Sequence, residues 1–316
     1  MKKLKVVYMG TPNFSVPALD ALIKNTNVIM VVTSPDAYVG RKKVLTECEV
    51  KKFAKENNIE TFSPINIKKE YQKITDLKPD IIITCAYGQI IPKELLEAPK
   101  YGCINIHASL LPKYRGGAPI HHAIINDESK TGITIMYMDE GMDTGDIIVK
   151  EEVQIIEEDN IETLSNKLSI LGSKMIIDVL PKVINKTITR IKQNNKEASY
   201  APIIKREHEL LDFKNKTARE IFNQVRALSP SPLAYFKIDN KDYKVEECEI
   251  ISQAGKPNTV IKADKESLVI MAKDKGVSIL KIKPVGKNTM TIKDFFNGND
   301  PNNFIKKEVN KNEKSI

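Results

Sequence analysis

Residues 4–12 read LKVVYMGTP, a short run of apolar and β-branched residues that ends at a Gly-Thr-Pro turn. Such a run predicts a buried strand, and the apolar spacing in residues 15–24 predicts a helix directly after it. Residues 28–33 (VIMVVT) predict a second buried strand. A strand, a helix and a strand in this order indicate a βαβ unit, and therefore a mostly parallel sheet in an α/β, Rossmann-like domain.

The same alternation continues to about residue 185. We expect further strands at 80–84, 103–107, 133–138 and 147–153, and helices at 119–126 and 160–185. Residues 1–188 are therefore predicted to form one Rossmann-like α/β domain, which we expect to be the catalytic domain.

The last third of the chain has a different pattern. Residues 189–209 are polar and charged, which predicts a linker, and residues 217–228 predict a helix. Five short apolar runs then follow between Leu233 and Pro284, which is the pattern of a small barrel. We therefore expect an OB-like β-barrel domain at 210–316, with a frayed, charged end from Lys306 onward.

The composition narrows the class of protein. Of 316 residues 41% are hydrophobic and 28% are charged, with 49 Lys and Arg, 41 Asp and Glu, and a net charge of +8. This balance is typical of soluble globular proteins. No apolar run predicts a signal peptide or a membrane span, and four scattered cysteines do not form a disulfide framework. We expect a cytoplasmic protein with no metal site.

The positive charge is unevenly distributed. Residues 207–316 hold 20 Lys and Arg against 16 Asp and Glu, so half of the excess lies on the last third of the chain. An excess of this kind favours an anionic partner without deciding between nucleic acid, a phosphate-bearing small molecule and a membrane surface.

Residues 105–117 (NIHASLLPKYRGG) carry the polar residues that suggest a site. Asn105 and His107 are two positions apart on the predicted strand, so their side chains leave the same face, while Ile104 and Ile106 face the other way. The pair lies at the end of a strand, where active sites of open α/β sheets form. The alternative is a hydrogen-bonded structural pair.

A second polar segment, DEGMDTGD at residues 139–146, follows the predicted strand 133–138. We expect it to open at the same edge of the sheet as His107. A calcium loop is disfavoured because the EF-hand spacing and its final Glu are missing. A solvated acidic turn remains the simple alternative to a catalytic carboxylate.

Asn, His and Asp together suit acyl transfer to an amine. Asn or protonated His can stabilise an oxyanion, and His with a carboxylate partner can move the protons. A serine hydrolase is disfavoured because the chain has no Gly-x-Ser-x-Gly elbow. A dinucleotide-dependent oxidoreductase is disfavoured because the first turn, GTPNFS at 10–15, lacks the Gly-x-Gly-x-x-Gly spacing.

Several motifs in order resemble the formyltransferase family that uses 10-formyltetrahydrofolate. They are NIH at 105–107, SLLP at 109–112 and the Asp143 loop, together with GTPNF at 10–14, AYG at 86–88, RGGAPI at 115–120 and YAP at 200–202. The last four are similar to the branch of the family that formylates methionyl-tRNA. The similarity runs through nearly the whole chain, including the predicted barrel.

The resemblance implies roles for particular residues. Asn105, His107 and Asp143 would form the catalytic trio, with the first two on the oxyanion and Asp143 orienting His107. The folate co-substrate, 10-formyltetrahydrofolate, would be bordered by Ser109, Leu110, Leu111 and Pro112, and its pterin would enter a pocket near Tyr87, Gly88 and Ile91. Phe14 would receive the methionyl side chain, and Arg41, Lys42 and Lys43 would contact initiator methionyl-tRNA in translation initiation.

One segment departs from the family pattern. The loop that usually reads Pro-Asp-Arg-Pro-x-Gly-Arg-Gly is PDAYVGRKK at 35–43, which lacks an Arg and several prolines. We expect this loop to be less pre-ordered before tRNA binds. The simpler alternative is that these basic residues belong to an ordinary solvated surface loop.

Other acceptors are compatible with the same chemistry. A formyltransferase for a nucleotide-linked amino sugar can have a similar two-part layout, whereas a purine-pathway enzyme would need only the first domain. A non-catalytic RNA-binding protein would leave Asn105, His107 and Asp143 without a purpose. The resemblance also implies a monomer.

Overall fold

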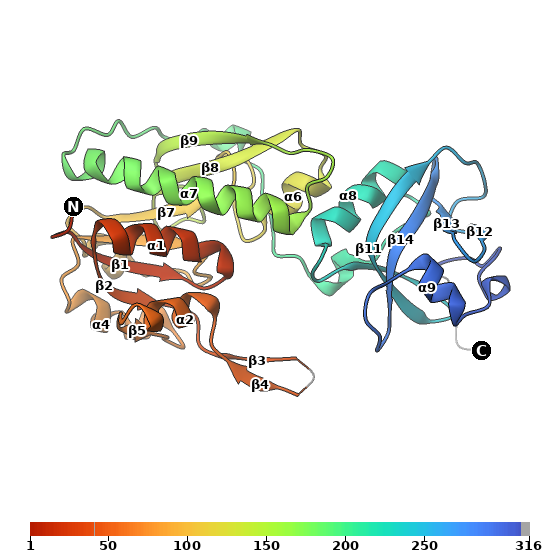
Figure 1. Cartoon of the computed structure of the whole chain (residues 1–316). Coiled ribbons are helices and arrows are strands. Elements are labelled where there is room, and N and C mark those ends of the chain that lie inside the picture. Colours follow the sequence, from red (N-terminus) through yellow and green to blue (C-terminus); the bar gives the residue numbers. More distant parts are fainter. Residues whose placement is uncertain (41, 311–316) are drawn as a thin grey trace. The chain divides into compact units, whose positions relative to one another are not determined.

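The structure is a computed structural model that describes residues 1–40 and 42–310. The chain forms two compact units (Figure 1). The first contains Met1–Pro119, Lys130–Gln154 and Ser165–Pro202, and the second contains Ile120–Ser129, Ile155–Leu164 and the chain from Ile203 onward.

A seven-stranded sheet forms the centre of the first unit, in the order β5-β2-β1-β6-β7-β8-β9. Its strands in chain order are β1 (Lys5–Gly10), β2 (Asn27–Val32), β5 (Thr61–Phe62), β6 (Ile81–Cys85), β7 (Cys103–His107), β8 (Lys130–Tyr137) and β9 (Ile147–Gln154). The first five run parallel to one another, β8 is antiparallel to β7, and β9 is antiparallel to β8. The predicted mostly parallel α/β sheet is confirmed.

Helices alternate with these strands. They are α1 (Val16–Asn25), α2 (Glu49–Glu56), α3 (Ile67–Glu70), α4 (Gln72–Thr75), α5 (Lys93–Glu97), α6 (Pro119–Ile125) and α7 (Ile161–Ile184). The helices α2 to α5 were not individually located from sequence; α3, α4 and α5 have only four or five residues, too few to show a helical period.

Helix α7 approaches the sheet closely at Gly172. A Cβ atom at this position would lie 2.8 Å from Cγ2 of Ile106, so only glycine fits without a shift. Ile104 and Ile106 are both buried on this side. Asn105 and His107 therefore lie on the opposite face of β7, as the strand alternation predicts.

Strand β8 differs from the sequence prediction in direction. His107 pairs with Thr134 and Ile104 pairs with Tyr137, so β8 ends beside the start of β7. The expectation that the loop 139–146 opens at the same edge as His107 is wrong. The loop reaches His107 only by folding back from Tyr137, which a period-two pattern cannot reveal because it carries no strand direction.

The short strands β3 (Ala37–Val39) and β4 (Val44–Thr46) pair as a hairpin within the segment that departs from the family pattern. Tyr38 lies directly opposite Leu45. Gly40 has φ +72°, and the Lys43 amide donates to the Gly40 carbonyl at 3.1 Å. The expectation that this segment is less pre-ordered before tRNA binds stays a prediction.

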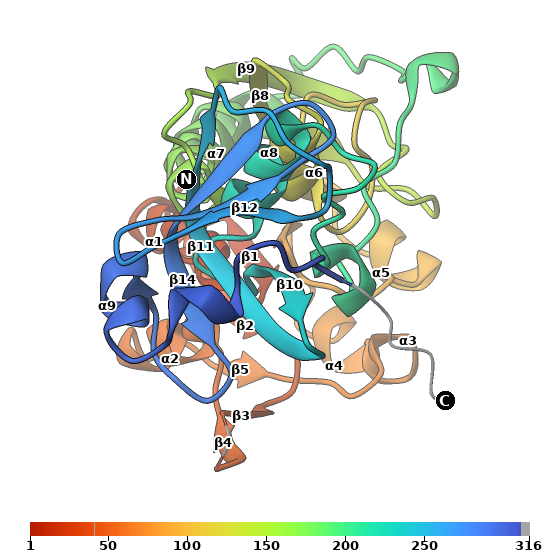
Figure 2. The ribbon, with the colours of Figure 1, turned by 90° about the vertical axis from the view of Figure 1, so that its right-hand side faces the viewer.

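The second unit contains an antiparallel sheet in the order β10-β11-β14-β13-β12, with β15 paired to β14. The elements are α8 (Ala218–Leu228), β10 (Ala234–Ile238), β11 (Lys241–Ile251), β12 (Val260–Ala263), β13 (Leu268–Met271), β14 (Gly276–Pro284), β15 (Met290–Thr291) and α9 (Ile292–Asn297). Figure 2 shows the long strands β11 and β14 of this sheet, which pair along most of their length. The predicted helix and five strands are confirmed, and they form a half-barrel.

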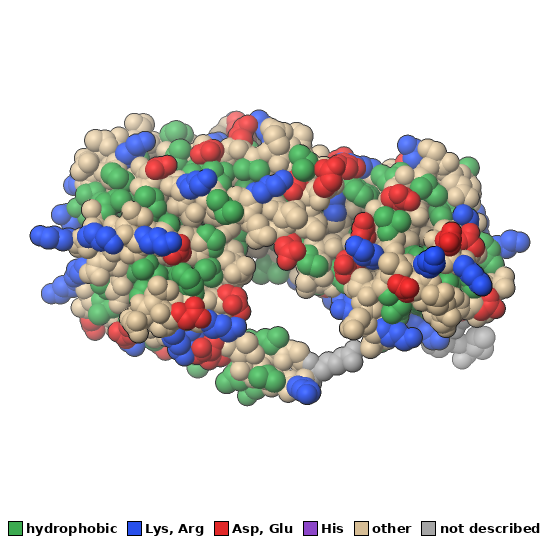
Figure 3. Space-filling model, viewed as in Figure 1, with side chains coloured by type: hydrophobic (Ala, Val, Ile, Leu, Met, Phe, Trp, Pro, Cys, Tyr) green, Lys and Arg blue, Asp and Glu red, His purple; other side chains and the backbone are tan. Residues whose placement is uncertain are grey.

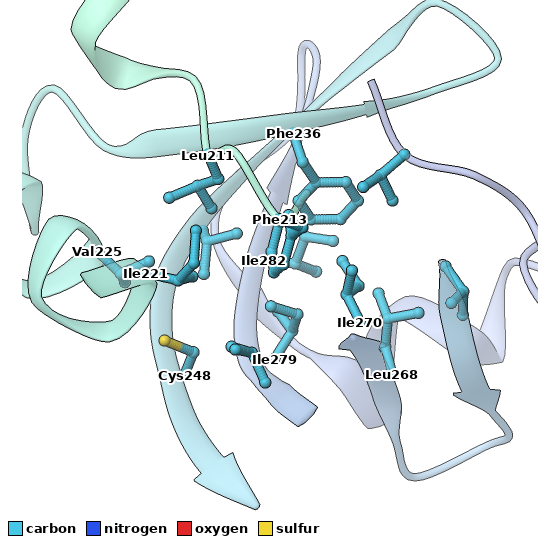
Figure 4. Packing of buried hydrophobic residues seen from close by; sticks show 14 of the residues in the cluster. Leu211, Phe213, Ile221, Val225, Phe236, Cys248, Leu268, Ile270, Ile279 and Ile282 are labelled. Atoms are coloured by element: carbon cyan, nitrogen blue, oxygen red, sulfur yellow. The ribbon is translucent and has the colours of Figure 1, made fainter. Parts of the chain in front are cut away.

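The core of the second unit lies between α8 and this curved sheet. Figure 4 shows side chains from the helix, such as Ile221, meeting Phe213, Phe236 and Ile279. Phe213 and Phe236 pack edge to face with their ring centroids 6.1 Å apart. Each fully buried side chain of this size contributes roughly 1.5–3 kcal/mol from burial.

The C-terminal segment completes the half-barrel. Glu308 forms an antiparallel bridge with Thr259 beside β12. Asn310 donates its backbone N–H to the Lys237 carbonyl in β10 at 2.8 Å, and its Oδ1 accepts from the Lys237 amide at 2.9 Å. The segment therefore hydrogen-bonds to both edge strands, and the expected fraying from Lys306 is wrong as far as Asn310.

Among the described residues, no helix is long and apolar enough to cross a membrane.

Candidate active site

Asn105 is oriented by a threonine on the neighbouring strand. Thr84 on β6 is in register with Asn105 on β7, and its Oγ1 donates to Asn105 Oδ1 at 2.8 Å. This contact leaves the Nδ2 group as the donor that faces Asp143, with 3.5 Å between Nδ2 and Asp143 Oδ1. Asn105 can therefore present an N–H group to an oxyanion.

The ring of His107 is nearly buried and has a defined orientation. Its Nε2 lies 3.0 Å from the carbonyl oxygen of Tyr114. A carbonyl can only accept, so Nε2 carries a hydrogen. The other nitrogen, Nδ1, is 3.6 Å from Asp143 Oδ1. Nδ1 is thus the nitrogen that can take up a proton, and the carboxylate stabilises the resulting imidazolium.

Asp143 is held through both its side chain and its backbone. Its Oδ2 accepts from the Gly116 amide at 2.8 Å. Its carbonyl accepts from Gln193 Nε2 at 2.8 Å, and its φ is +54°. A left-handed backbone at a residue other than glycine is unfavourable and persists only where the surroundings fix it. The structure thus brings Asn105, His107 and Asp143 together.

Three supporting residues were missed from sequence: Thr84, Gly116 and Gln193. Thr84 could have been found, because it lies at the end of the adjacent predicted strand at the level of Asn105. Gly116 acts through its amide, which no side-chain pattern shows. Gln193 lies in the segment predicted to be a linker, and nothing in its sequence context indicates a role.

The segment 109–112 forms a rigid loop after β7. Ser109 is buried, and its Oγ donates to the Lys113 carbonyl at 2.6 Å, so this hydroxyl closes the loop on itself. Leu111 is also buried and packs with Met136 and Ile147. Leu110 and Pro112 are half-buried.

Tyr87, Gly88 and Ile91 follow β6, which is parallel to β7, so they lie at the same edge as the segment 109–112. Tyr87 is buried, which raises the pKa of its hydroxyl, and this hydroxyl has no hydrogen-bond partner among the described residues. Gly88 has φ +89°, and a Cβ there would meet nothing within 4 Å. Ile91 is buried in the same cluster as Tyr87. At this edge the buried side chains of Tyr87 and Ile91 therefore lie beside unfilled space at Gly88.

The remaining predicted residues are more dispersed. Phe14 is half-buried in a 3-10 turn (Asn13–Ser15) after β1, at the same edge of the parallel strands. Lys42 and Lys43 are exposed at the turn of the β3–β4 hairpin. Arg41 lies outside the described residues.

Comparison with known families decides the family. Residues 2–180 match the family described as formyl transferase, and residues 203–300 match the formyl transferase C-terminal domain. The chain belongs to the formyl transferase family. Two proteins of similar fold were solved with folate compounds: HypX from Aquifex aeolicus with tetrahydrofolic acid, and the sugar 3N-formyl transferase WlaRD with 5-N-formyl-THF.

Curated relatives are similar over nearly their full length. The methionyl-tRNA formyltransferase of Bacillus subtilis (strain 168) is 46% identical over 300 residues, covering 93% of this chain and 94% of that protein. Those of Bacillus pumilus and Macrococcus caseolyticus are 47% and 45% identical, with 93% of this chain covered in each case. Coverage of those two proteins is 94% and 95%.

Solved structures share the fold. The methionyl-tRNA formyltransferase of Clostridium thermocellum has a TM-score of 0.54 and is 20% identical, covering 90% of this chain and all of that chain (100%). An N-formyltransferase from Helicobacter canadensis, solved with folinic acid and dTDP-3-aminofucose, has a TM-score of 0.66 at 23% identity. It covers 88% of this chain and 99% of that chain. At these identities the likeness shows the fold alone.

Proposed function

We propose that the protein transfers the formyl group of 10-formyltetrahydrofolate to the amino group of initiator methionyl-tRNA, and so supplies N-formylmethionyl-tRNA for translation initiation. The observation that carries this proposal is the joint placement of Asn105, His107 and Asp143. The full-length relatives named methionyl-tRNA formyltransferase support the choice of acceptor.

The reaction begins with attack of the methionyl nitrogen on the formyl carbon. A new carbon–nitrogen bond forms, and the carbonyl electrons move to the oxygen. Asn105 Nδ2 faces this developing charge, and one preorganised donor of this kind contributes about 10²–10³ in rate. The second donor is the N–H that His107 gains when it takes up the proton of the attacking amine.

Proton transfer accompanies this attack. His107 Nδ1 takes the proton of the attacking amine, and Asp143 stabilises the imidazolium from 3.6 Å away. His107 then delivers this proton to N10 of the folate as the bond between N10 and the formyl carbon breaks. The products are tetrahydrofolate and the formylated aminoacyl-tRNA, and the protein returns to its starting protonation state.

The loops at the edge of the sheet would bind the two substrates. We assign the folate to Ser109–Pro112 and to Tyr87, Gly88 and Ile91, where an open edge borders an apolar wall. In this arrangement Ser109 shapes the loop, because its hydroxyl is engaged with Lys113. Phe14 would contact the methionyl side chain.

The tRNA would extend from this edge along basic surface. Lys42 and Lys43 on the hairpin, together with Arg41, would contact phosphates, since Lys and Arg supply most of the sequence-independent affinity for nucleic acid. We assign catalysis to residues 1–188 with the support of residues 189–202 of the first unit, and further tRNA binding to 210–316. The protein would act as a monomer in the cytoplasm.

The decisive experiment is a formyl-transfer assay with labelled 10-formyltetrahydrofolate. Initiator methionyl-tRNA, elongator methionyl-tRNA, free methionine and a dTDP-linked amino sugar would be compared as acceptors. We expect rapid labelling of initiator methionyl-tRNA alone. If the amino sugar is labelled in preference to the tRNA, the amino sugar is the acceptor and the proposed acceptor is wrong. If no acceptor is labelled, the whole proposal is overturned.

A further inference from the structure

Gln193 lies outside every motif of the catalytic trio, yet its carboxamide is fully used within the first unit. Its Nε2 donates to the carbonyl oxygens of Asp143 and Gly145, each at 2.8 Å. Its Oε1 accepts from Nε and Nη2 of Arg115, at 3.1 and 2.8 Å. One side chain thus connects the loop of Asp143 to a buried guanidinium.

Arg115 is itself fixed by the same segment of chain as Gln193. Its side chain is buried, and its Nη2 also donates to Asn195 Oδ1 at 2.9 Å. Its backbone N–H donates to the Ser199 carbonyl at 2.8 Å, and its carbonyl accepts from the Ala201 amide at 2.7 Å. Residues 193–201 therefore form a continuous brace along Arg115.

The chain just before the brace also contacts the point where the Asp143 loop returns to the sheet. Ile191 and Ile147 exchange two backbone hydrogen bonds, at 2.8 and 3.0 Å. The loop that carries Asp143 is thus held where it returns to the sheet and again at its own carbonyl groups.

Asp143 needs such support because two of its features depend on its neighbours. Its backbone is left-handed, at φ +54°. Its Oδ2 accepts from the amide of Gly116, the residue next to Arg115. Arg115 and Gln193 together set the spacing between Gly116 and the Asp143 backbone, and this spacing fixes where the carboxylate points.

We propose that Gln193 is a positioning residue for formyl transfer: it holds the Asp143 backbone so that the carboxylate faces His107, and Arg115 keeps the Gln193 carboxamide in the required orientation. This inference rests on the proposed function, which gives Asp143 its role in the reaction. Gln193 acts through Asp143 and contacts neither substrate.

The test compares two amide-to-acid changes at adjacent positions. Gln193→Glu keeps the size of the side chain but replaces the donor to two carbonyls with a carboxylate oxygen, which repels them. Asn194→Asp adds the same charge one residue away, where the exposed side chain hydrogen-bonds within its own segment, to Lys196 and Glu197. Both variants would be assayed in the full chain.

We expect Gln193→Glu to lower kcat about 10- to 100-fold, because a displacement of about 1 Å of a catalytic group has effects of this size. KM for methionyl-tRNA and for 10-formyltetrahydrofolate should stay within about twofold. Asn194→Asp should match the wild type in both constants. A rise in KM with unchanged kcat would assign Gln193 to substrate binding and overturn the proposal.

A double-mutant cycle with Asp143→Asn separates positioning from a general structural effect. If Gln193 acts through Asp143, Gln193→Glu should change kcat by no more than about twofold once Asp143 has lost its charge. Multiplicative losses would overturn the proposal. If Gln193→Glu does not fold, as judged by circular dichroism, the uncharged Gln193→Met variant takes its place in the same cycle.

The two proposals fail in different ways. A wild-type protein that formylates no methionyl-tRNA contradicts the proposed function. An active wild type with a fully active Gln193→Glu variant contradicts the positioning role alone.

Discussion

Two irregular segments of the first unit, the loop 139–146 and the hairpin 37–46, are held in opposite ways. The loop is fixed from outside: Gly116 binds the Asp143 carboxylate, and Gln193 binds two of its carbonyl groups. The hairpin is fixed by its own ladder, in which Tyr38 faces Leu45. Figure 3 shows hydrophobic side chains exposed over β3 and β4.

The difference follows from what each segment does in the proposed reaction. A catalytic carboxylate has to remain within a fraction of an ångström of its working position, so neighbouring chain segments surround it. A surface that receives a large substrate can move as a body, and Tyr38 and Leu45 remain 72% and 57% exposed. Exposed apolar side chains of this kind are typical of an interaction surface.

The largest effect should come from removing the imidazole that the loop serves. His107→Ala should lower kcat by about 10²–10⁴, because general acid–base catalysis contributes a factor of that size. Binding of methionyl-tRNA should be retained, since the ring is nearly buried and contacts Tyr114 and Asp143. Single-turnover formylation and a filter-binding titration measure the two quantities.

A matched control is His208→Ala, which removes an exposed histidine from the second unit. It should leave the rate unchanged. If His107→Ala keeps near wild-type turnover, the assignment of the proton-transfer group is wrong.

The second effect tests how tightly the catalytic loop is held from outside. Gly116 has φ +118°, and a Cβ there would lie 2.8 Å from the Ala201 carbonyl oxygen. Gly116→Ala should therefore displace the amide that binds Asp143, lower kcat about tenfold and cost about 1–3 kcal/mol of the free energy of unfolding. Steady-state kinetics and urea denaturation measure both.

Gly40→Ala in the hairpin supplies the comparison for that change. Gly40 also has a positive φ, +72°, but a Cβ there would meet nothing within 4 Å. It should lose some stability with no change in kcat. Equal losses of kcat in both variants would mean that backbone strain, rather than contact with Asp143, sets the rate.

The extent to which side-chain positions could be predicted from the sequence also differs between these regions. The placement of Asn105 and His107 on one strand face followed from alternation alone, because side chains on a strand alternate whatever its partners are. The position of Asp143 did not follow: β8 is antiparallel to β7, and strand direction leaves no trace in an apolar pattern. The resemblance to a family supplied Asp143 instead.

Contacts made by the backbone, or between residues far apart in the sequence, could not be predicted from the sequence. Gln193 binds carbonyl groups 48 and 50 residues away, within a segment that its polar composition marked as a linker. The hairpin was missed for a related reason: two strands of three residues are too short to show a period. The half-barrel was foreseen because its longer apolar runs are separated by turn residues.

A third effect concerns the apolar surface of the hairpin. The double variant Tyr38→Ser with Leu45→Ser should raise KM for methionyl-tRNA about three- to tenfold, because both side chains are available to an acceptor end. Stability and kcat should not change. Val285→Ser, which removes a side chain 73% exposed in the second unit, is the control. A fall in kcat with constant KM would show that the hairpin serves the chemistry rather than docking.

The smallest effect concerns the base of the hairpin, where Lys51 Nζ donates to Asp36 Oδ1 at 2.7 Å. The hydrogen bond to Asp36 raises the pKa of Lys51 above its ordinary value of 10.5. A group whose pKa is raised on folding stabilises the fold below its unfolded pKa, and this contribution is lost as the pH rises through the folded pKa. Lys51→Met should therefore cost less than about 1 kcal/mol near neutral pH, and less still in strong alkali.

Urea midpoints of the wild type and Lys51→Met at about pH 8 and about pH 11 measure this difference. The gap between the two proteins should narrow at the higher pH. Lys52→Met is the comparison for a more exposed pair, because Lys52 and Glu49 are 41% and 55% exposed against 15% and 25% for Lys51 and Asp36, and its gap should be smaller at both pH values. If the gap is independent of pH, the methylene chain of Lys51 rather than its charge holds the base. The base of the hairpin would then be held by apolar contacts of Lys51, whereas the loop of Asp143 is held by hydrogen bonds.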